Sequence, residues 1–120
     1  MKKKTMVLGA STNTERYSNM AVKKLQLHQH PVVAIGNKIG TINDTPIIKE
    51  TPDINDVDTV TLYLNPTNQQ PYYDYILSLH PKRIIFNPGT ENKTLEKIAT
   101  EKGIQTIEAC TLVLLATNQF

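Results

Sequence analysis

Short apolar segments alternate with amphipathic segments along most of the chain. The apolar segments are rich in β-branched and other aliphatic residues, which is typical of buried strands. We expect strands at residues 5–8, 31–35, 58–64, 82–86 and 104–108. Apolar residues at helical spacing, with capping residues before them, predict helices at 18–29, from 67 or 68 to 79, at 91–102 and at 110–116.

The segment between the second and third of these strands follows neither pattern. Residues 36–52 are rich in Gly, Pro, Asn and Asp, so they predict turns, with at most a short edge strand near 47–48. Residues 53–56 predict a single helical turn.

Strands that alternate with helices are typical of an α/β domain with a mostly parallel sheet. Because crossovers between parallel strands are right-handed, this order predicts a three-layer, doubly wound, Rossmann-like sheet of about five strands. We see no repeat or linker, so residues 1–120 are expected to form one domain.

Composition narrows the class of protein further. The 120 residues include 13 Lys and Arg and 11 Asp and Glu, a balance that does not favour a nucleic-acid-binding protein. The longest apolar runs are far shorter than a membrane span. The only cysteine is Cys110, which excludes an internal disulfide framework and a zinc site built from several cysteines. We therefore expect a cytoplasmic protein without a metal, as a monomer or small homo-oligomer.

The residues that follow the predicted strands have a common chemistry. Small, hydroxylated, amidic or prolyl residues stand there, and backbone N–H groups and neutral donors at helix N-termini suit an anionic or polar ligand. The same residue types are also ordinary in turns. The segments are Gly9-Ala10-Ser11, Gly36-Asn37-Lys38, Asn65-Pro66, Asn87-Pro88-Gly89 and Ala109-Cys110.

The first of these turns does not fit a dinucleotide fingerprint. Of the pattern G-x-G-x-x-G it keeps only Gly9, and no acidic residue follows the second strand to bind the ribose hydroxyls of NAD. Lys38 would instead suit a phosphate on the adenosine ribose, as in NADP or coenzyme A, and it is equally compatible with a solvated loop lysine.

An ordered set of residues across nearly the whole chain resembles the small CoA-binding domain family. These are stand-alone proteins similar to the domain at the amino end of the succinyl-CoA synthetase α-subunit. The set comprises residues 7–11, 16–18 and 32–37, Pro46, residues 58–60, Asn65-Pro66, residues 87–89, Asn92 and Cys110.

The resemblance implies that coenzyme A lies across the carboxyl ends of the strands. Gly9, Ala10 and Ser11 would approach the diphosphate, and Ser18 would add a donor. Asn37 and Lys38 would lie near the adenosine, and Pro66 along the adenine or pantetheine path. Pro88 and Gly89 would lie beside the pantetheine. The other residues expected beside the ligand are Arg16, Asn65, Asn92 and Cys110.

One departure from the family concerns the end of the second strand. The family usually has Val-Asn-Pro there, whereas this chain has Ile-Gly-Asn-Lys, so Lys38 replaces the proline. The phosphohistidine domain and partner subunit of the synthetase have no counterpart in the chain, so the resemblance does not imply ligase activity.

The candidate reactive groups do not form a catalytic set. His28, His30 and His80 precede strands, on the edge away from the ligand, and no nucleophile, base and orienting group occur together. A helix N-terminus lowers the pKa of a thiol, so Cys110 is a candidate to form a mixed disulfide with coenzyme A. The alternative is that Cys110 is a small packed residue. We therefore expect non-catalytic binding of coenzyme A or an acyl-CoA by a carrier, sensor or regulatory module. The alternatives are a small enzyme that uses NADP or another nucleotide, and a regulatory domain without a ligand.

Overall fold

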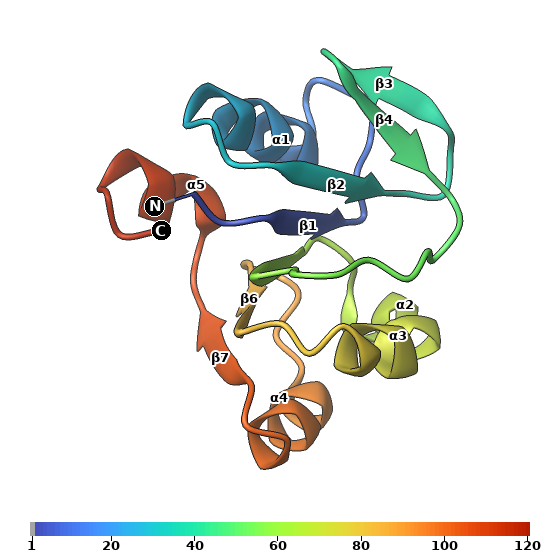
Figure 1. Ribbon diagram of the computed structural model, residues 1–120, viewed down its shortest axis with the longest axis vertical. Coiled ribbons are helices and arrows are strands. Elements are labelled where there is room, and N and C mark those ends of the chain that lie inside the picture. Colours follow the sequence, from blue (N-terminus) through green and yellow to red (C-terminus); the bar gives the residue numbers. More distant parts are fainter. Residues whose placement is uncertain (1) are drawn as a thin grey trace.

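A seven-stranded sheet forms the centre of the molecule, and helices cover both of its faces (Figure 1). The computed structural model describes residues 2–120. The strands are β1 (Thr5–Leu8), β2 (Val32–Ile35), β3 (Gly40–Ile42), β4 (Thr45–Ile48), β5 (Thr59–Leu62), β6 (Arg83–Phe86) and β7 (Gln105–Glu108). The helices are α1 (Tyr17–Leu27), α2 (Pro66–Gln69), a 3₁₀ turn at Gln70–Tyr72, α3 (Tyr73–Ser78), α4 (Lys93–Glu101) and α5 (Thr111–Ala116).

The spatial order of the strands is β3-β4-β2-β1-β5-β6-β7, and only β3 is antiparallel to its neighbour. Without β3, this is the strand order of the doubly wound dinucleotide-binding folds. The chain moves outward from β1 toward β4, then returns and moves outward from β5 toward β7. The direction therefore reverses between β1 and β5, which is where such sheets bind their ligands.

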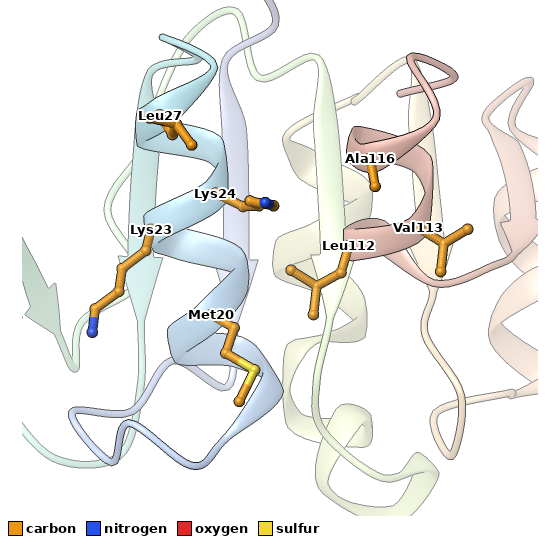
Figure 2. Close-up of a pocket in the computed structure, with 7 residues that line it drawn as sticks. All are labelled: Met20, Lys23, Lys24, Leu27, Leu112, Val113 and Ala116. Carbon is orange, nitrogen blue, oxygen red and sulfur yellow. The ribbon is translucent and has the colours of Figure 1, made fainter.

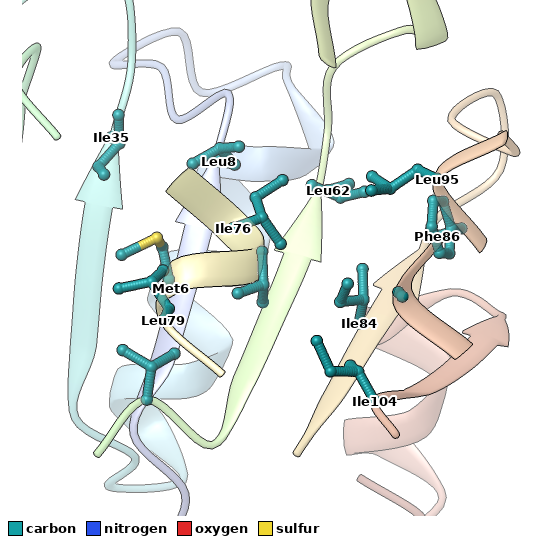
Figure 3. Close-up of a cluster of buried hydrophobic side chains, with 13 residues drawn as sticks. Met6, Leu8, Ile35, Leu62, Ile76, Leu79, Ile84, Phe86, Leu95 and Ile104 are labelled. Atoms are coloured by element: carbon teal, nitrogen blue, oxygen red, sulfur yellow. The ribbon is translucent and has the colours of Figure 1, made fainter. Parts of the chain in front are cut away.

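Side chains of alternate residues along the buried strands point to opposite faces of the sheet. On β1, Met6 and Leu8 pack in a cluster with residues of α3 and α4, as Figure 3 shows for Ile76 and Leu95. Val7 points to the opposite face, where it packs in a second cluster with residues of α1 and α5. These two clusters give the three-layer arrangement that the alternation of segments predicted.

The predicted count of about five strands is too low. The turn-rich segment forms a hairpin of β3 and β4, joined by Asn43 and Asp44, with Asn43 at a φ of 51°. Asparagine tolerates this left-handed conformation, but the pattern lacks the glycine that marks such hairpins most clearly. Pro46 lies within β4 and obscured the strand further.

Two predicted helical segments also differ from the structure. The turn expected at 53–56 is absent, and the chain there is irregular, with Val57 buried and Ile54 half-buried against the α3 face of the sheet. The helix expected up to Leu79 is interrupted by the 3₁₀ turn that contains Pro71, because proline supplies no N–H for an α-helical bond.

The helix starts lie one or two positions from those predicted. Arg16 occupies the N-cap of α1, so Ser18 lies inside its first turn. Asn65, rather than Thr67 or Asn68, caps α2. None of the helices in residues 2–120 combines the length and apolar character of a membrane span.

Candidate functional site

The loops that follow β2, β1, β5, β6 and β7 form a row along the carboxyl edge of the sheet. Adjacent strands lie roughly 4.8 Å apart, so this row extends over about 19 Å. It brings together most of the residues predicted for the site, and Arg16 and Ser18 follow at the start of α1. The loop residues are Gly9, Ala10, Ser11, Asn37, Lys38, Asn65, Pro66, Pro88, Gly89 and Cys110.

The loop after β1 makes a sharp turn at Gly9, at the point where the strand order reverses. Gly9 has a φ of +97°, and a Cβ there would lie 3.1 Å from the backbone carbon of Tyr63. The N–H groups of Gly9 and Ala10 both donate to the carbonyl of Ile35, at 2.8 and 2.9 Å. These two residues therefore shape the turn, and their amides are not free for a ligand.

The loops after β1 and β2 are in direct contact. A Cβ on Gly36 would overlap the carbonyl oxygen of Ala10, so only glycine lets the two loops approach this closely. Asn37 and Lys38 follow at once, and both side chains are exposed. The close approach keeps Lys38 near the turn at Gly9.

The N-terminus of α1 carries donors that the protein does not use. The N–H groups of Ser11, Thr12, Tyr17 and Ser18 find no acceptor within residues 2–120. Arg16, at the N-cap, gives no side-chain hydrogen bond to the helix and is exposed. The helix dipole adds partial positive charge at the same place. The start of α1 therefore suits an anion.

Two side chains in the first turn of α1 also have hydrogen-bonding groups that the described residues do not use. Ser18 is only 3% exposed, yet its hydroxyl forms no hydrogen bond with the described residues. Asn19 donates from Nδ2 to the carbonyl of Ser11 at 2.9 Å, while its buried Oδ1 has no partner among residues 2–120. Asn19 was not among the residues predicted from the sequence, although its place directly after Ser18 was a usable signal.

The asparagines at the other helix starts have their capping oxygens in use. Asn65 accepts from the N–H of Asn68 at 2.8 Å. Asn92 is buried, accepts from the N–H of Leu95, and donates to the side chains of Gln69 and Tyr73. The side chain of Asn92 therefore serves to join the start of α4 to the neighbouring helices.

A buried polar cluster holds the loop after β6 and the start of α5. Asn87 donates to Thr61 Oγ1 at 2.7 Å and to the carbonyl of Leu62 at 2.9 Å, and it accepts from the N–H of Thr111 at 2.8 Å. The hydroxyls of Thr61 and Thr111 are 2.7 Å apart. Asn87 thus fixes the end of β5, the end of β6 and the start of α5 in one arrangement.

Tyr63 lies beside this cluster. Burial raises the pKa of its phenol to about 12, against the smaller opposing effect of the hydroxyls of Thr111 and Thr61. The phenol is therefore protonated at neutral pH and cannot act as a base. Cys110 stands at the N-cap of α5, half-buried, with a thiol that caps no backbone group.

The histidines lie at the opposite edge, as the sequence indicated. His28 is the C-cap residue of α1, and His30 Nδ1 accepts from the N–H of Lys3 at 3.0 Å. Burial, helped by the nearby charge of Lys2, lowers the pKa of His30 below its usual 6.5. His80 follows α3 at the same edge. These side chains therefore lie away from the carboxyl edge.

A comparison with known protein families supports a ligand-binding role for this edge. Residues 3–116 match the family described as a CoA binding domain. The chain belongs to this family. No curated protein matches the chain.

Solved structures show the same fold in other proteins. A crystal structure described only as an uncharacterized protein is 51% identical, with a TM-score of 0.98, and the match covers 100% of this chain and 99% of that one. A hypothetical protein from Pyrococcus horikoshii OT3 is 25% identical, with a TM-score of 0.83, and the match covers 93% of this chain and 80% of that one. A cell-free protein from Thermus thermophilus shares the fold at 18% identity and a TM-score of 0.85, over 99% and 91% of the two chains.

The residues of this family member fit a ligand that carries a diphosphate. The unused N–H groups at the start of α1 are suitable donors for phosphate oxygens, and Arg16 and Lys38 supply positive charge. The row of loops supplies length for a long ligand. The carboxyl edge of the sheet is therefore the candidate coenzyme A site.

Proposed function

We propose that the protein binds coenzyme A or an acyl-CoA at the carboxyl edge of its sheet, without catalysis, as a carrier, sensor or regulatory module. The observation that carries this proposal is the uncapped N-terminus of α1, in a chain that belongs to a CoA-binding family. A binding module needs groups that hold a ligand and no catalytic set, and the unused donors at the start of α1 support this proposal.

The diphosphate lies against the start of α1. The N–H groups of Ser11, Thr12 and Tyr17 donate to its oxygens, and the hydroxyl of Ser18 adds a further donor. Gly9 and Ala10 hold the turn that presents these groups, through their bonds to Ile35. The guanidinium of Arg16 faces the charge from outside.

The adenosine lies toward β2. Asn37 and Lys38 are exposed there and stand next to the turn at Gly9. The ammonium of Lys38 pairs with the 3′-phosphate of the ribose, which distinguishes coenzyme A from NAD. A phosphate on the 2′-hydroxyl of NADP would also attract Lys38, so NADP is the appropriate competitor in a test.

The pantetheine runs along the other loops toward Cys110. Asn65 and Pro66 follow β5, Pro88 and Gly89 follow β6, and these residues line the way along the edge. The arm thus ends near the half-buried thiol of Cys110, and a disulfide with the coenzyme A thiol stays a prediction. Mass spectrometry after incubation with oxidised coenzyme A tests it, with Cys110→Ser as the control.

A thermal shift comparison tests the proposal. The melting temperature is measured with coenzyme A, NADP and NAD at matched concentrations. A ligand present at 100 times its dissociation constant adds about 2.7 kcal/mol to the free energy of unfolding, so binding is readily seen. We expect coenzyme A to raise the melting temperature most. A larger response to NADP supports the nucleotide-using enzyme, and no response to any of the three supports a regulatory domain without a ligand.

A further inference from the structure

An apolar groove of about 540 Å³ runs between α1 and α5, on one face of the sheet (Figure 2). From α1, Met20 and Leu27 line it, and from α5, Leu112, Val113 and Ala116. The two helices contact each other along this face. The groove is separate from the loops that form the candidate coenzyme A site, although Met20 lies close to the start of α1.

The side chains around this groove are unusually exposed for their type. Five large hydrophobic residues are exposed in residues 2–120, and four of them belong to α1 or α5. Leu27 is 72% exposed and Val113 is 55% exposed. The core on this face is already filled by other residues of the same helices, such as Leu25 and Leu115. A gathered set of exposed apolar side chains marks an interaction surface.

The shape of the groove suits a helix. Both α1 and α5 start at the carboxyl edge and run toward the amino edge, so they lie side by side in the same direction (Figure 2). α1 has 11 residues and a length of about 16 Å. A partner helix of about three turns would match the length of α1, and its apolar stripe would contact the six residues of α5 over about 9 Å of that length.

The charge of the surface selects the kind of partner. Lys23 and Lys24 line the groove, and in Figure 2 Lys24 extends from α1 toward α5 while Lys23 extends to the other side of α1. Neither α1 nor α5 contains an acidic residue that could neutralise them. Two copies joined through this face would bring lysines together without carboxylates. A helix with acidic residues beside its apolar stripe would pair with them.

We propose that the groove between α1 and α5 docks an amphipathic helix of a partner protein, apolar on one side and flanked by Asp or Glu. This proposal goes beyond the binding of coenzyme A and does not depend on it. Leu27 and Val113 supply apolar contact on the two sides of the groove. Lys23 and Lys24 set the preference for an acidic partner.

Two synthetic peptides of about 14 residues test the proposal against the full chain. Both carry the same leucine stripe at helical spacing, and the flanking positions are Glu in one and Lys in the other. Binding is followed by fluorescence anisotropy of a dye on each peptide. We expect the Glu peptide to bind about tenfold more tightly than the Lys peptide, since two ion pairs form only with the former.

Matched variants tie the result to this groove. Leu27→Asp and Val113→Asp should each abolish binding of the Glu peptide, while Ile39→Asp, at an exposed hydrophobic residue outside the groove, should leave it unchanged. The double change Lys23→Glu with Lys24→Glu should reverse the preference between the peptides. All these positions are at the surface, and unchanged melting temperatures confirm that the variants are folded.

Three results would overturn the proposal. Failure of both peptides to bind would show that the groove does not accept a helix. Equal affinity for the two peptides would show that Lys23 and Lys24 do not select an acidic partner. A concentration-dependent dimer in sedimentation, abolished by Val113→Asp, would assign the face to a second copy of the chain.

Discussion

The amino edge of the sheet and the start of α1, at the carboxyl edge, use their polar groups in opposite ways. At the amino edge, Lys2, Lys3 and Lys4 donate to the carbonyls of His28, Phe120 and Asn55. Lys82 pairs with Asp58 at 3.9 Å. The amino edge is rich in charge, and its lysines are engaged with the protein itself.

At the carboxyl edge, Glu108 at the end of β7 pairs with Lys93 at the start of α4 at 3.1 Å, but groups at the start of α1 have no such partners. The N–H groups at the start of α1 have no acceptor among the described residues, and the hydroxyl of Ser18 forms no hydrogen bond there. Unsatisfied donors therefore indicate a candidate binding edge better than a count of charged residues does. Substitutions at the two edges should therefore have contrasting effects on stability and on binding.

Gly9→Val should have the largest effect. Valine is strained at a φ of +97°, and its Cβ would press on the backbone of Tyr63, so we expect a loss of stability of about 1–3 kcal/mol and no measurable binding of coenzyme A. Isothermal titration and thermal melting measure the two effects. Gly103→Val is the matched control, because Gly103 has a φ of +80° but a Cβ added there would meet no atom within 4 Å, and it precedes β7 at the amino edge. Full affinity in Gly9→Val would remove the turn from the site.

Lys38→Ala tests the proposed ion pair between the Lys38 ammonium and the 3′-phosphate of the ribose. We expect affinity for coenzyme A to fall by about 1–3 kcal/mol, the range for a charge-assisted hydrogen bond, and affinity for dephospho-CoA to stay nearly constant. Lys82→Ala, at the amino edge, should leave both affinities unchanged. Equal losses for the two ligands in Lys38→Ala would contradict a contact with the 3′-phosphate.

Ser18→Ala compares an unused hydroxyl with a used one. Because the hydroxyl of Ser18 bonds to nothing in the described part of the chain, its removal should leave the melting temperature unchanged and weaken coenzyme A binding by about 0.5–1.5 kcal/mol. Thr5 donates to the carbonyl of Lys3 at 2.8 Å, so Thr5→Val should lower the melting temperature and leave binding intact. A loss of stability in Ser18→Ala with unchanged affinity would reverse the assignment.

For His30, at the amino edge, we expect a smaller effect on stability that depends on pH. Because burial lowers its pKa in the folded protein, protons bind preferentially to the unfolded chain as the pH falls below 6.5. The melting temperature should therefore decrease as the pH is lowered through this range, and it should decrease less in His30→Gln. Identical pH profiles for the two proteins would show that His30 does not contribute.

The sequence carried enough information for the main layout of the fold. The runs at β1, β5 and β6 were recognised because they are continuously apolar or β-branched, and the resemblance to the CoA-binding family was confirmed by the match over residues 3–116. The hairpin of β3 and β4 was underestimated, since its signal depends on a left-handed Asn43 and on pairing with a distant strand.

The site was harder to predict in detail than the edge on which it lies. The sequence indicated the loops but could not show that Ile35 takes the N–H groups of Gly9 and Ala10, because that contact joins neighbouring strands. Asn19 follows Ser18 directly, which was a usable signal, but its bond to the carbonyl of Ser11 depends on how the loop after β1 folds back on α1. Hydrogen bonds between segments distant in sequence decide which donors remain free.

The most direct test of the central claim is a titration of ¹⁵N-labelled protein with coenzyme A, followed by NMR of the backbone amides. We expect the signals of Ser11, Thr12, Tyr17 and Ser18 to move most, while those of Lys2 to Lys4 and Lys82 at the amino edge stay in place. Unchanged signals at the start of α1, with binding observed elsewhere on the protein, would contradict it.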